Sequence, residues 1–173
     1  MFVVDPLKDY PTETESRVII RFQDCDPLKH LNNAKYFDYF FNAREDQVPK
    51  LYGVEFLDFI DSFEAIWVVY NHHIAYLKPA NMGEWVRIKS RIVWFDLNSM
   101  VVEYVMMNDH QTHLKTLMWT TLKYVGMNTS QTVNHSEEVL NYLKAIQFPG
   151  VDYHPHRFDE RVQEVKNATR TIT

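Results

Sequence analysis

The sequence has little cysteine and glycine, and it has no long hydrophobic run. Cys25 is the only cysteine among 173 residues, so a disulfide within the chain is excluded. No stretch of the sequence reaches the roughly 20 apolar residues that a membrane-spanning helix needs. No apolar signal run is found near Met1 either, and a cytoplasmic location is therefore the expectation.

An excess of positive charge is also missing. The formal net charge is −5 at pH 7, whereas nucleic-acid-binding proteins depend on a basic surface, so nucleic acid is not expected as a partner. What the chain has is apolar mass, since 46% of its residues are hydrophobic and 14% are aromatic. Together with the length, this composition favours one globular domain with a large apolar core or pocket.

The most informative part of the sequence lies between Arg17 and Gln47. Alternation over residues 17–22 predicts a strand, and Asp24-Cys25-Asp26-Pro27 then predicts a turn. An aromatic pattern follows and predicts a helix from about Asn33 to Val48, which Pro49 ends or kinks. The strand face predicted to be buried carries Val18, Ile20 and Phe22.

The turn between this strand and this helix has two interpretations. The first backbone N–H groups of a helix lack intrahelical partners and can polarise a carbonyl or hold an oxyanion. A carboxylate beside them, from Asp24 or Asp26, could act as a base or nucleophile in ester or thioester hydrolysis. Asp24, Asn32 and Asn33 are equally ordinary as turn and N-cap residues, and the residues alone leave both interpretations open.

The segment RFQDCDPLKHLNNAKYFDYFFNARED, which begins at Arg21, resembles the signature of the 4-hydroxybenzoyl-CoA thioesterase type of hotdog-fold proteins. That signature has an aromatic-ended strand, an Asp-x-Asp turn, a loop with His and Asn-Asn, and a tyrosine-containing helix. The resemblance implies an α+β hotdog fold, with an antiparallel sheet wrapped around a long central helix, over residues 16–147. The matching residues are Phe22, Asp24, Cys25, Asp26, His30, Leu31, Asn32, Asn33 and Tyr36.

The resemblance also implies roles for particular residues. Asp26 corresponds to the catalytic carboxylate, the backbone N–H near Asn33 to the group that polarises the thioester carbonyl, and His30 to a residue that contacts the substrate or holds the Asp26 loop. The substrate-binding residues that we expect are Tyr36, Lys29 and Asn32. Lys29 departs from the family, which commonly has glycine there, and lysine adopts some glycine conformations only at a cost. The loop and the acyl pocket can therefore differ in shape from those of the family.

The function implied is that of an acyl-CoA thioesterase, which releases a free acid and CoA with Asp26 as general base or as nucleophile. The acyl group is expected in an apolar pocket lined partly by aromatic residues of the central helix, and no metal or organic cofactor is expected. The family further implies a homodimer or homotetramer with the active site between subunits. The alternatives are a non-catalytic hotdog protein that binds acyl-CoA or acyl carrier protein, and a hotdog dehydratase, whose motifs we do not find. Acyl chain and carrier stay open.

The rest of the chain predicts the same architecture independently. Strands separated by short polar turns indicate antiparallel pairing, and they are predicted at residues 65–77, 85–95, 100–107 and 112–125. A further helix is predicted at residues 134–146. One early helix followed by four long strands predicts an α+β fold with the sheet curled over the helix. Residues 1–15 are expected to be a lead-in, and residues 148–173 a surface-tethered or partly disordered tail.

Several other polar groups are candidate sites that also have a structural interpretation. His72 and His73 should point to opposite faces of a strand, so they should not bind one metal ion. The His154-Pro155-His156 segment lacks a third ligand nearby. The Cys25 thiol lies between two aspartates, whose charge raises a thiol pKa and argues against a nucleophile. Glu45 resembles the helix carboxylate used by another hotdog lineage, and we interpret it as solvated or ion-paired.

A row of basic residues has two interpretations. Arg87, Lys89 and Arg91 alternate along a predicted strand, where they form a solvated face or meet the phosphates of CoA. Lys29 and Lys35, near the Asp26 turn, are further candidates for contacts with those phosphates.

Overall fold

The computed structural model describes residues 8–170, which form one five-stranded antiparallel sheet and four α-helices. The strand order is β1-β3-β4-β5-β2, so β1 and β2 are the two edges. The strands are β1 (Thr14–Ile19), β2 (Ala65–Tyr76), β3 (Trp85–Phe95), β4 (Ser99–Asn108) and β5 (Leu114–Gly126). The helices are α1 (Tyr36–Tyr52), α2 (Phe56–Phe63), α3 (Glu137–Ile146) and α4 (Phe158–Arg170). Parts of the expected lead-in and tail, residues 1–7 and 171–173, lie outside the described residues.

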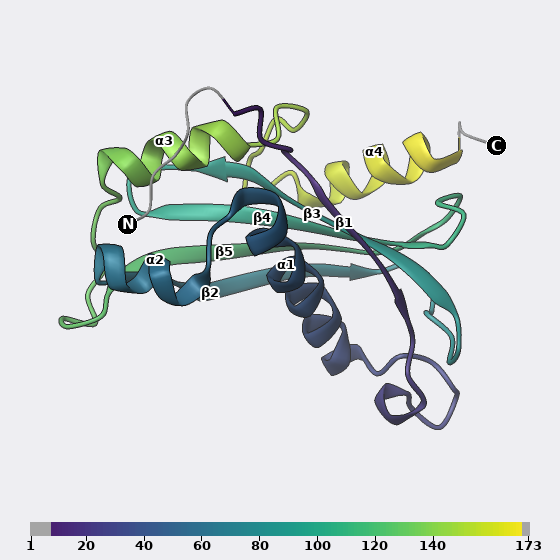
Figure 1. Ribbon diagram of the computed structural model, residues 1–173. Coiled ribbons are helices and arrows are strands. Elements are labelled where there is room, and N and C mark those ends of the chain that lie inside the picture. Colours follow the sequence, from purple (N-terminus) through teal and green to yellow (C-terminus); the bar gives the residue numbers. More distant parts are fainter. Residues whose placement is uncertain (1–7, 171–173) are drawn as a thin grey trace.

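The alternation of the strands gives the sheet two apolar faces. In the central strand β4, Val102 and Tyr104 belong to the core cluster that contains residues of α1 and α3. Val101 and Val105, which point the other way, belong to a second cluster with residues of α4. The sheet therefore separates two apolar layers, and α1 crosses one of its faces (Figure 1). This is the predicted α+β architecture, with a long helix against a curled antiparallel sheet.

The central helix α1 begins close to its predicted start but continues past its predicted end. A 3₁₀ turn, Asn33–Lys35, leads into it, and Phe40 is completely buried against the sheet. Pro49 does not end the helix, because it lies inside the last turn and the helix continues to Tyr52. Tyr52 is buried and packs edge-on against Tyr142 of α3, a contact that favours the extra turn. Gly53 then terminates the helix with a left-handed φ of 68°.

The first strand lies three residues earlier than predicted. β1 pairs with β3 from Thr14 opposite Ser90 to Ile19 opposite Trp85, where β3 begins. Beyond Ile19 the chain has no strand to pair with, so it turns into a 3₁₀ helix at Phe22–Asp24. The prediction that Phe22 is buried was wrong, since 81% of it is exposed, whereas Ile20 is buried as predicted.

Two helices were not predicted from the sequence. In α2, the buried ring of Phe59 stacks on Trp67 of β2 with ring centroids 4.6 Å apart. In α4, which lies in the expected tail, Val162 and Val165 are buried against the outer face of the sheet. The tail is therefore ordered over residues 158–170. Among the described helices, none combines the length and the apolar character needed to cross a membrane.

Candidate functional site

The segment between β1 and α1 forms a compact elbow in which the two aspartates are held differently. The Asp24 carboxylate accepts a hydrogen bond from the Tyr39 hydroxyl at 2.9 Å, and its carbonyl accepts one from the Asn32 N–H at 3.0 Å. Burial raises the pKa of Tyr39 to about 12, and the charge of Asp24 acts in the same direction. Asp24 therefore ties the elbow to the central helix.

The Asp26 carboxylate is tied on one side only. Its Oδ1 accepts hydrogen bonds from the backbone N–H groups of Leu28 at 2.9 Å and His30 at 3.0 Å. Its backbone N–H donates to the His30 carbonyl at 2.8 Å, which closes the loop. The other oxygen, Oδ2, makes no hydrogen bond within the part of the chain that the structure describes, and the side chain is half-buried. The loop thus fixes the carboxylate and leaves one oxygen for a water molecule or a substrate.

The loop itself is built around Lys29. Its φ of 64° lies in the left-handed region, which glycine adopts without a steric penalty and lysine only with one. The Lys29 carbonyl accepts from the Met82 N–H at 2.9 Å, and the Leu31 N–H donates to the Ala80 carbonyl at 2.8 Å. Lys29 thus takes a backbone conformation that suits glycine. His30 reaches Asp26 through its main chain, which supports the loop-holding role among the two expected for it.

The start of the central helix lies directly after this loop. Asn32 is the N-cap, and its side chain accepts a hydrogen bond from the Ala34 N–H at 3.0 Å. The neighbouring Asn33 N–H donates to no group among residues 8–170, and Asn33 is exposed. A free N–H at the positive end of a helix is able to bind a carbonyl oxygen.

Tyr36, the first residue of α1, fixes this helix start to the neighbouring segments. Only 2% of it is exposed, and its hydroxyl accepts a hydrogen bond from the Ala80 N–H at 3.3 Å. Its ring packs edge-on against Tyr76 with centroids 5.1 Å apart, and the Tyr76 hydroxyl donates to the Asn33 carbonyl at 3.0 Å. Tyr36 therefore positions the helix start, and a direct contact with substrate stays a prediction.

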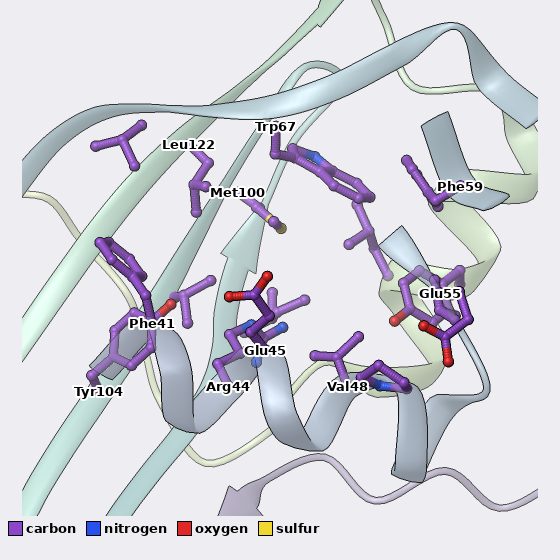
Figure 2. Close-up of a pocket in the computed structure, with 17 residues that line it drawn as sticks. Phe41, Arg44, Glu45, Val48, Glu55, Phe59, Trp67, Met100, Tyr104 and Leu122 are labelled. Carbon is purple, nitrogen blue, oxygen red and sulfur yellow. The ribbon is translucent and has the colours of Figure 1, made fainter. Parts of the chain in front are cut away.

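A cavity of about 580 Å³ lies beside the C-terminal half of α1. Figure 2 shows Glu45 and Val48 on one side of it and Trp67 and Leu122 on the other. The expected acyl pocket is apolar and lined partly by aromatic residues of the central helix. Phe41, an aromatic residue of α1, lines this cavity. Its remaining walls were missed, because they come from segments far apart in the sequence. The main residues of these walls are Val54, Phe59, Val69, Ile92, Met100, Val102, Tyr104, Tyr142 and Leu143.

The structure shows the surroundings of three other candidate site residues, Glu45, His72 and His73. Glu45 is exposed and forms no ion pair within the described residues. His72 and His73 point to opposite faces as predicted: the His72 ring lies 4.8 Å from that of Phe37, and the His73 ring lies 5.7 Å from that of Phe158.

The single cysteine is a poor nucleophile. Burial raises the pKa of the Cys25 thiol, and the neighbouring charges of Asp24 and Asp26 raise it further. Its Sγ also donates to the Arg21 carbonyl at 3.3 Å. The expected direction of the pKa shift is confirmed, with burial as the larger cause.

The basic row of β3 is neutralised within the protein. Arg87 pairs with Glu15 at 2.7 Å and with Asp109 at 3.1 Å, so its charge is already matched. Lys89 and Arg91 pair with Glu13 at 3.0 and 2.6 Å. The row is an ion-paired sheet face, neither freely solvated nor available to phosphates. Lys35 pairs with Asp38 at 2.9 Å. Of the basic residues named as candidates for the CoA phosphates, Lys29 is therefore the one that forms no ion pair within the described residues.

No group of three histidine, cysteine, aspartate or glutamate side chains suited to a metal ion occurs in residues 8–170. The His154 and His156 rings lie 5.4 Å apart without a third ligand of that kind.

Comparison with known proteins identifies the family. Residues 20–143 match the model of the thioesterase-like superfamily, and no curated protein matches the sequence. Among solved structures, the chain resembles the probable thioesterase YbaW from Escherichia coli, with a TM-score of 0.69, 18% identity, and coverage of 78% of this chain and 99% of that one.

Two further structures share the fold. The DHNA-CoA thioesterase from Staphylococcus aureus has a TM-score of 0.67 and 19% identity, over 90% of this chain and 94% of that one. The 12:0-ACP thioesterase from Umbellularia californica has a TM-score of 0.75 and 13% identity, over 85% of this chain and 55% of that one. At these identities the likeness establishes the fold, and the predicted α+β hotdog fold is confirmed.

Proposed function

This chain belongs to the thioesterase-like superfamily, and we propose that it hydrolyses the thioester bond of an acyl-CoA to a free acid and CoA. The observation that carries the proposal is the elbow between β1 and α1. There the Asp26 Oδ2 and the Asn33 N–H form no hydrogen bond within the described residues, and one short loop joins the two residues. A carboxylate oxygen and a carbonyl-binding N–H are the two groups that thioester hydrolysis requires.

In the proposed reaction, the Asn33 N–H accommodates the thioester oxygen and stabilises the negative charge that develops on it. Asp26 then takes a proton from a water molecule, and the water oxygen bonds to the carbonyl carbon. The carbon–sulfur bond breaks, and the departing CoA thiolate takes the proton from Asp26. The alternative is attack of an Asp26 oxygen on the carbonyl carbon, which breaks the carbon–sulfur bond, releases CoA and leaves a mixed anhydride that water hydrolyses. Label found in Asp26 after a single turnover in heavy-oxygen water would establish the second route, because water that opens the anhydride at the Asp26 carboxyl carbon leaves its oxygen there.

The remaining predicted site residues have supporting roles. The main chain of His30 and the left-handed Lys29 set the direction of the Asp26 carboxylate. Asn32 caps the helix start, and Tyr36 holds it from below. Lys29 is exposed and pairs with no carboxylate in the described part of the chain, so we assign its ammonium group to the CoA phosphates.

We also propose that the protein is a homodimer. β2 is an edge of the sheet and exposes Val68, Val69 and Tyr70 along its middle. Edge strands with exposed apolar side chains are prone to pair with another strand, and a second copy offers the same edge. The family resemblance implies an active site between the subunits.

The test is release of free thiol from a panel of acyl-CoA esters by the purified protein and by Asp26→Asn. This substitution keeps the side chain's shape and removes its charge, and we expect activity to fall at least about a hundredfold. Asp24→Asn is the matched control, because it removes the same charge at a position two residues before Asp26. The Asp24 carboxylate binds the Tyr39 hydroxyl and has no proposed part in the reaction. We expect it to lower stability while activity falls less than about tenfold.

Other outcomes would redirect the assignment. Full activity in Asp26→Asn would rule out Asp26 and make Glu45 the next carboxylate to replace. Binding of an acyl-CoA without any turnover would support the non-catalytic alternative, a protein that binds acyl-CoA or acyl carrier protein.

A further inference from the structure

We propose that the cavity beside α1 receives the tail of a medium- to long-chain alkyl acyl group, with the thioester at the elbow. The inference rests on the proposed function and adds to it a substrate class, an alkyl chain with about 6–14 carbons beyond the carbonyl. The estimate follows from the length of α1, taken at about 1.5 Å per residue, and from carbon–carbon bonds of about 1.5 Å.

The walls of the cavity suit a hydrocarbon. Twelve of its seventeen lining residues are aliphatic, phenylalanine, tryptophan, methionine or proline. They come from helices α1, α2 and α3, from strands β2 to β5 and from the loop between α1 and α2. The volume of about 580 Å³ is within the usual range of ligand pockets. Burying methylene groups there contributes roughly fourfold in affinity for each group.

The position of the cavity along α1 sets the length of the chain. Its lining begins at Phe41 and continues to Val48 and Pro49, whereas the carbonyl site lies at the helix start near Tyr36. Five residues separate Tyr36 from Phe41 and twelve separate it from Val48, so the cavity spans about 8 to 18 Å from the start of the helix. A staggered alkyl chain advances about 1.25 Å per carbon and reaches this interval with about 6–14 carbons beyond the carbonyl.

This distance separates an alkyl group from an aryl group. The ring of a benzoyl thioester lies within about 6 Å of its carbonyl carbon, judging from bond lengths of about 1.5 Å or less, and would end before Phe41. It would leave the cavity empty and forgo its burial energy. The distance from the helix start to the cavity therefore favours an alkyl chain.

The charges at the cavity argue for an uncharged tail. Glu45 and Glu55 are exposed members of its lining. Arg44 is half-buried and donates a hydrogen bond to Ser90 at 3.1 Å, so its guanidinium is directed toward β3. The lining thus has two carboxylates and one guanidinium, and this excess of negative charge disfavours a substrate whose acyl chain ends in a carboxylate.

The first experiment compares hydrolysis of butanoyl-, dodecanoyl- and benzoyl-CoA. We expect kcat/KM for dodecanoyl-CoA to exceed the other two at least a hundredfold. Val69→Trp places a large ring in the cavity, since Val69 lines it, and should reduce the preference for dodecanoyl-CoA over butanoyl-CoA at least tenfold.

Val68→Trp is the matched control for this substitution. Val68 neighbours Val69 on the same strand, is similarly exposed, and points to the opposite face of the sheet. Both variants add the same ring to strand β2, so sedimentation of both separates an effect on the cavity from an effect on assembly. Equal chain-length profiles for the two variants would overturn the proposal.

A second experiment does not depend on turnover. Trp67 lines the cavity, so the bromine of ω-bromododecanoic acid should quench its fluorescence, whereas bromine next to the carboxyl group should not. Trp67→Phe should abolish the difference between the two acids. Equal quenching by both acids places the tail elsewhere and overturns the inference, even if the thioesterase activity is confirmed. Selective quenching without hydrolysis retains the cavity as an alkyl site and rejects the proposed reaction.

Discussion

Asp24 and Asp26 show how much two identical side chains can differ within one turn. The Asp24 carboxylate accepts a hydrogen bond from the Tyr39 hydroxyl and so holds the elbow on α1. In Asp26, two backbone N–H groups bind one carboxylate oxygen, and the other oxygen has no hydrogen bond within the described residues. A carboxylate held in this way needs no further reorganisation before it meets a water molecule or a substrate, which is the advantage of a preorganised site.

At Lys29 the backbone predicts a simple exchange. The left-handed φ of 64° costs a lysine roughly 1 kcal/mol that a glycine does not pay. We expect Lys29→Gly to raise the free energy of unfolding by about that amount and to keep the loop geometry. Lys29→Val should instead destabilise the loop, because a β-branched side chain is an outlier at positive φ. Urea denaturation measures both, and equal stability of the two variants would contradict this account.

His135 predicts a loss of stability in mild acid. Its Nε2 accepts from the Trp67 indole N–H at 3.0 Å, so its Nδ1 carries the proton and donates to the Asp96 carbonyl at 3.0 Å. Burial lowers the pKa of His135, and of His72 as well, so the unfolded chain binds more protons than the folded one below about pH 6.5. The free energy of unfolding should therefore fall as pH drops below that value.

The effect is at most about 1.4 kcal/mol per pH unit for each histidine. Denaturant unfolding between about pH 7 and pH 5 measures it, above the range in which ordinary carboxylates titrate. His135→Gln removes one titrating group and retains an acceptor for Trp67, so its stability should depend less steeply on pH. An unchanged slope would assign the acid sensitivity to other groups.

Among the elements, α4 is joined to the sheet by a buried ion pair. Glu103 is fully buried in β4 and accepts from Arg91 at 2.7 Å, from the Trp119 indole at 2.8 Å and from Arg161 of α4 at 2.9 Å. Burial by itself would raise the pKa of Glu103, but the hydrogen bonds and charges of Arg161 and Arg91 together outweigh it and lower the pKa. Arg161 of α4 and Arg91 of β3 thus keep the carboxylate charged inside the protein.

Removing one partner of this cluster should be costly. We expect Arg161→Ala to lower the free energy of unfolding by roughly 3 kcal/mol or more, since it leaves a buried carboxylate with one cation fewer. Arg157→Ala is the matched control, because Arg157 pairs with Asp152 and Glu160 on the exposed side and its loss should hardly change the midpoint. Thermal unfolding of both variants provides the comparison, and similar midpoints would contradict a role for the buried pair.

Elements with a strong local pattern could be predicted from the sequence, and those that depend on distant partners could not. The clean alternation of Val86, Ile88 and Ile92 identified β3, because one face of that strand meets the core. α4 escaped prediction because its buried stripe is narrow and lies in a polar segment. The end of β1 depends on where β3 begins, which no pattern near Ile19 records.

The same distinction applies to the site. Asp26 and the Asn33 N–H are seven residues apart and could be proposed from one motif. The cavity could not, because Phe59, Met100 and Leu143 come together only through the fold.

For the molecule as a whole, the uncovered edge of β2 predicts its assembly. Introducing charge into the exposed apolar stretch, as in Tyr70→Lys, should shift a dimer toward monomers, because lysine on an edge strand discourages pairing. Sedimentation velocity measures the shift. Lys78→Glu is a suitable control outside β2, at another exposed position. A monomeric wild type, or a Tyr70→Lys protein that stays dimeric, would show that subunits meet elsewhere or not at all.

The link between Glu103 and Arg161 has a consequence for the order in which the protein is made. The two residues are 58 positions apart, so a ribosome that adds about 5–20 residues per second completes Glu103 roughly 3–12 s before Arg161. During that interval Trp119 is also synthesised but α4 is not there to cover it. Any part of the sheet that folds in this interval carries Glu103 without Arg161 on an uncovered apolar face, and exposed apolar surface of this kind is what chaperones protect from aggregation.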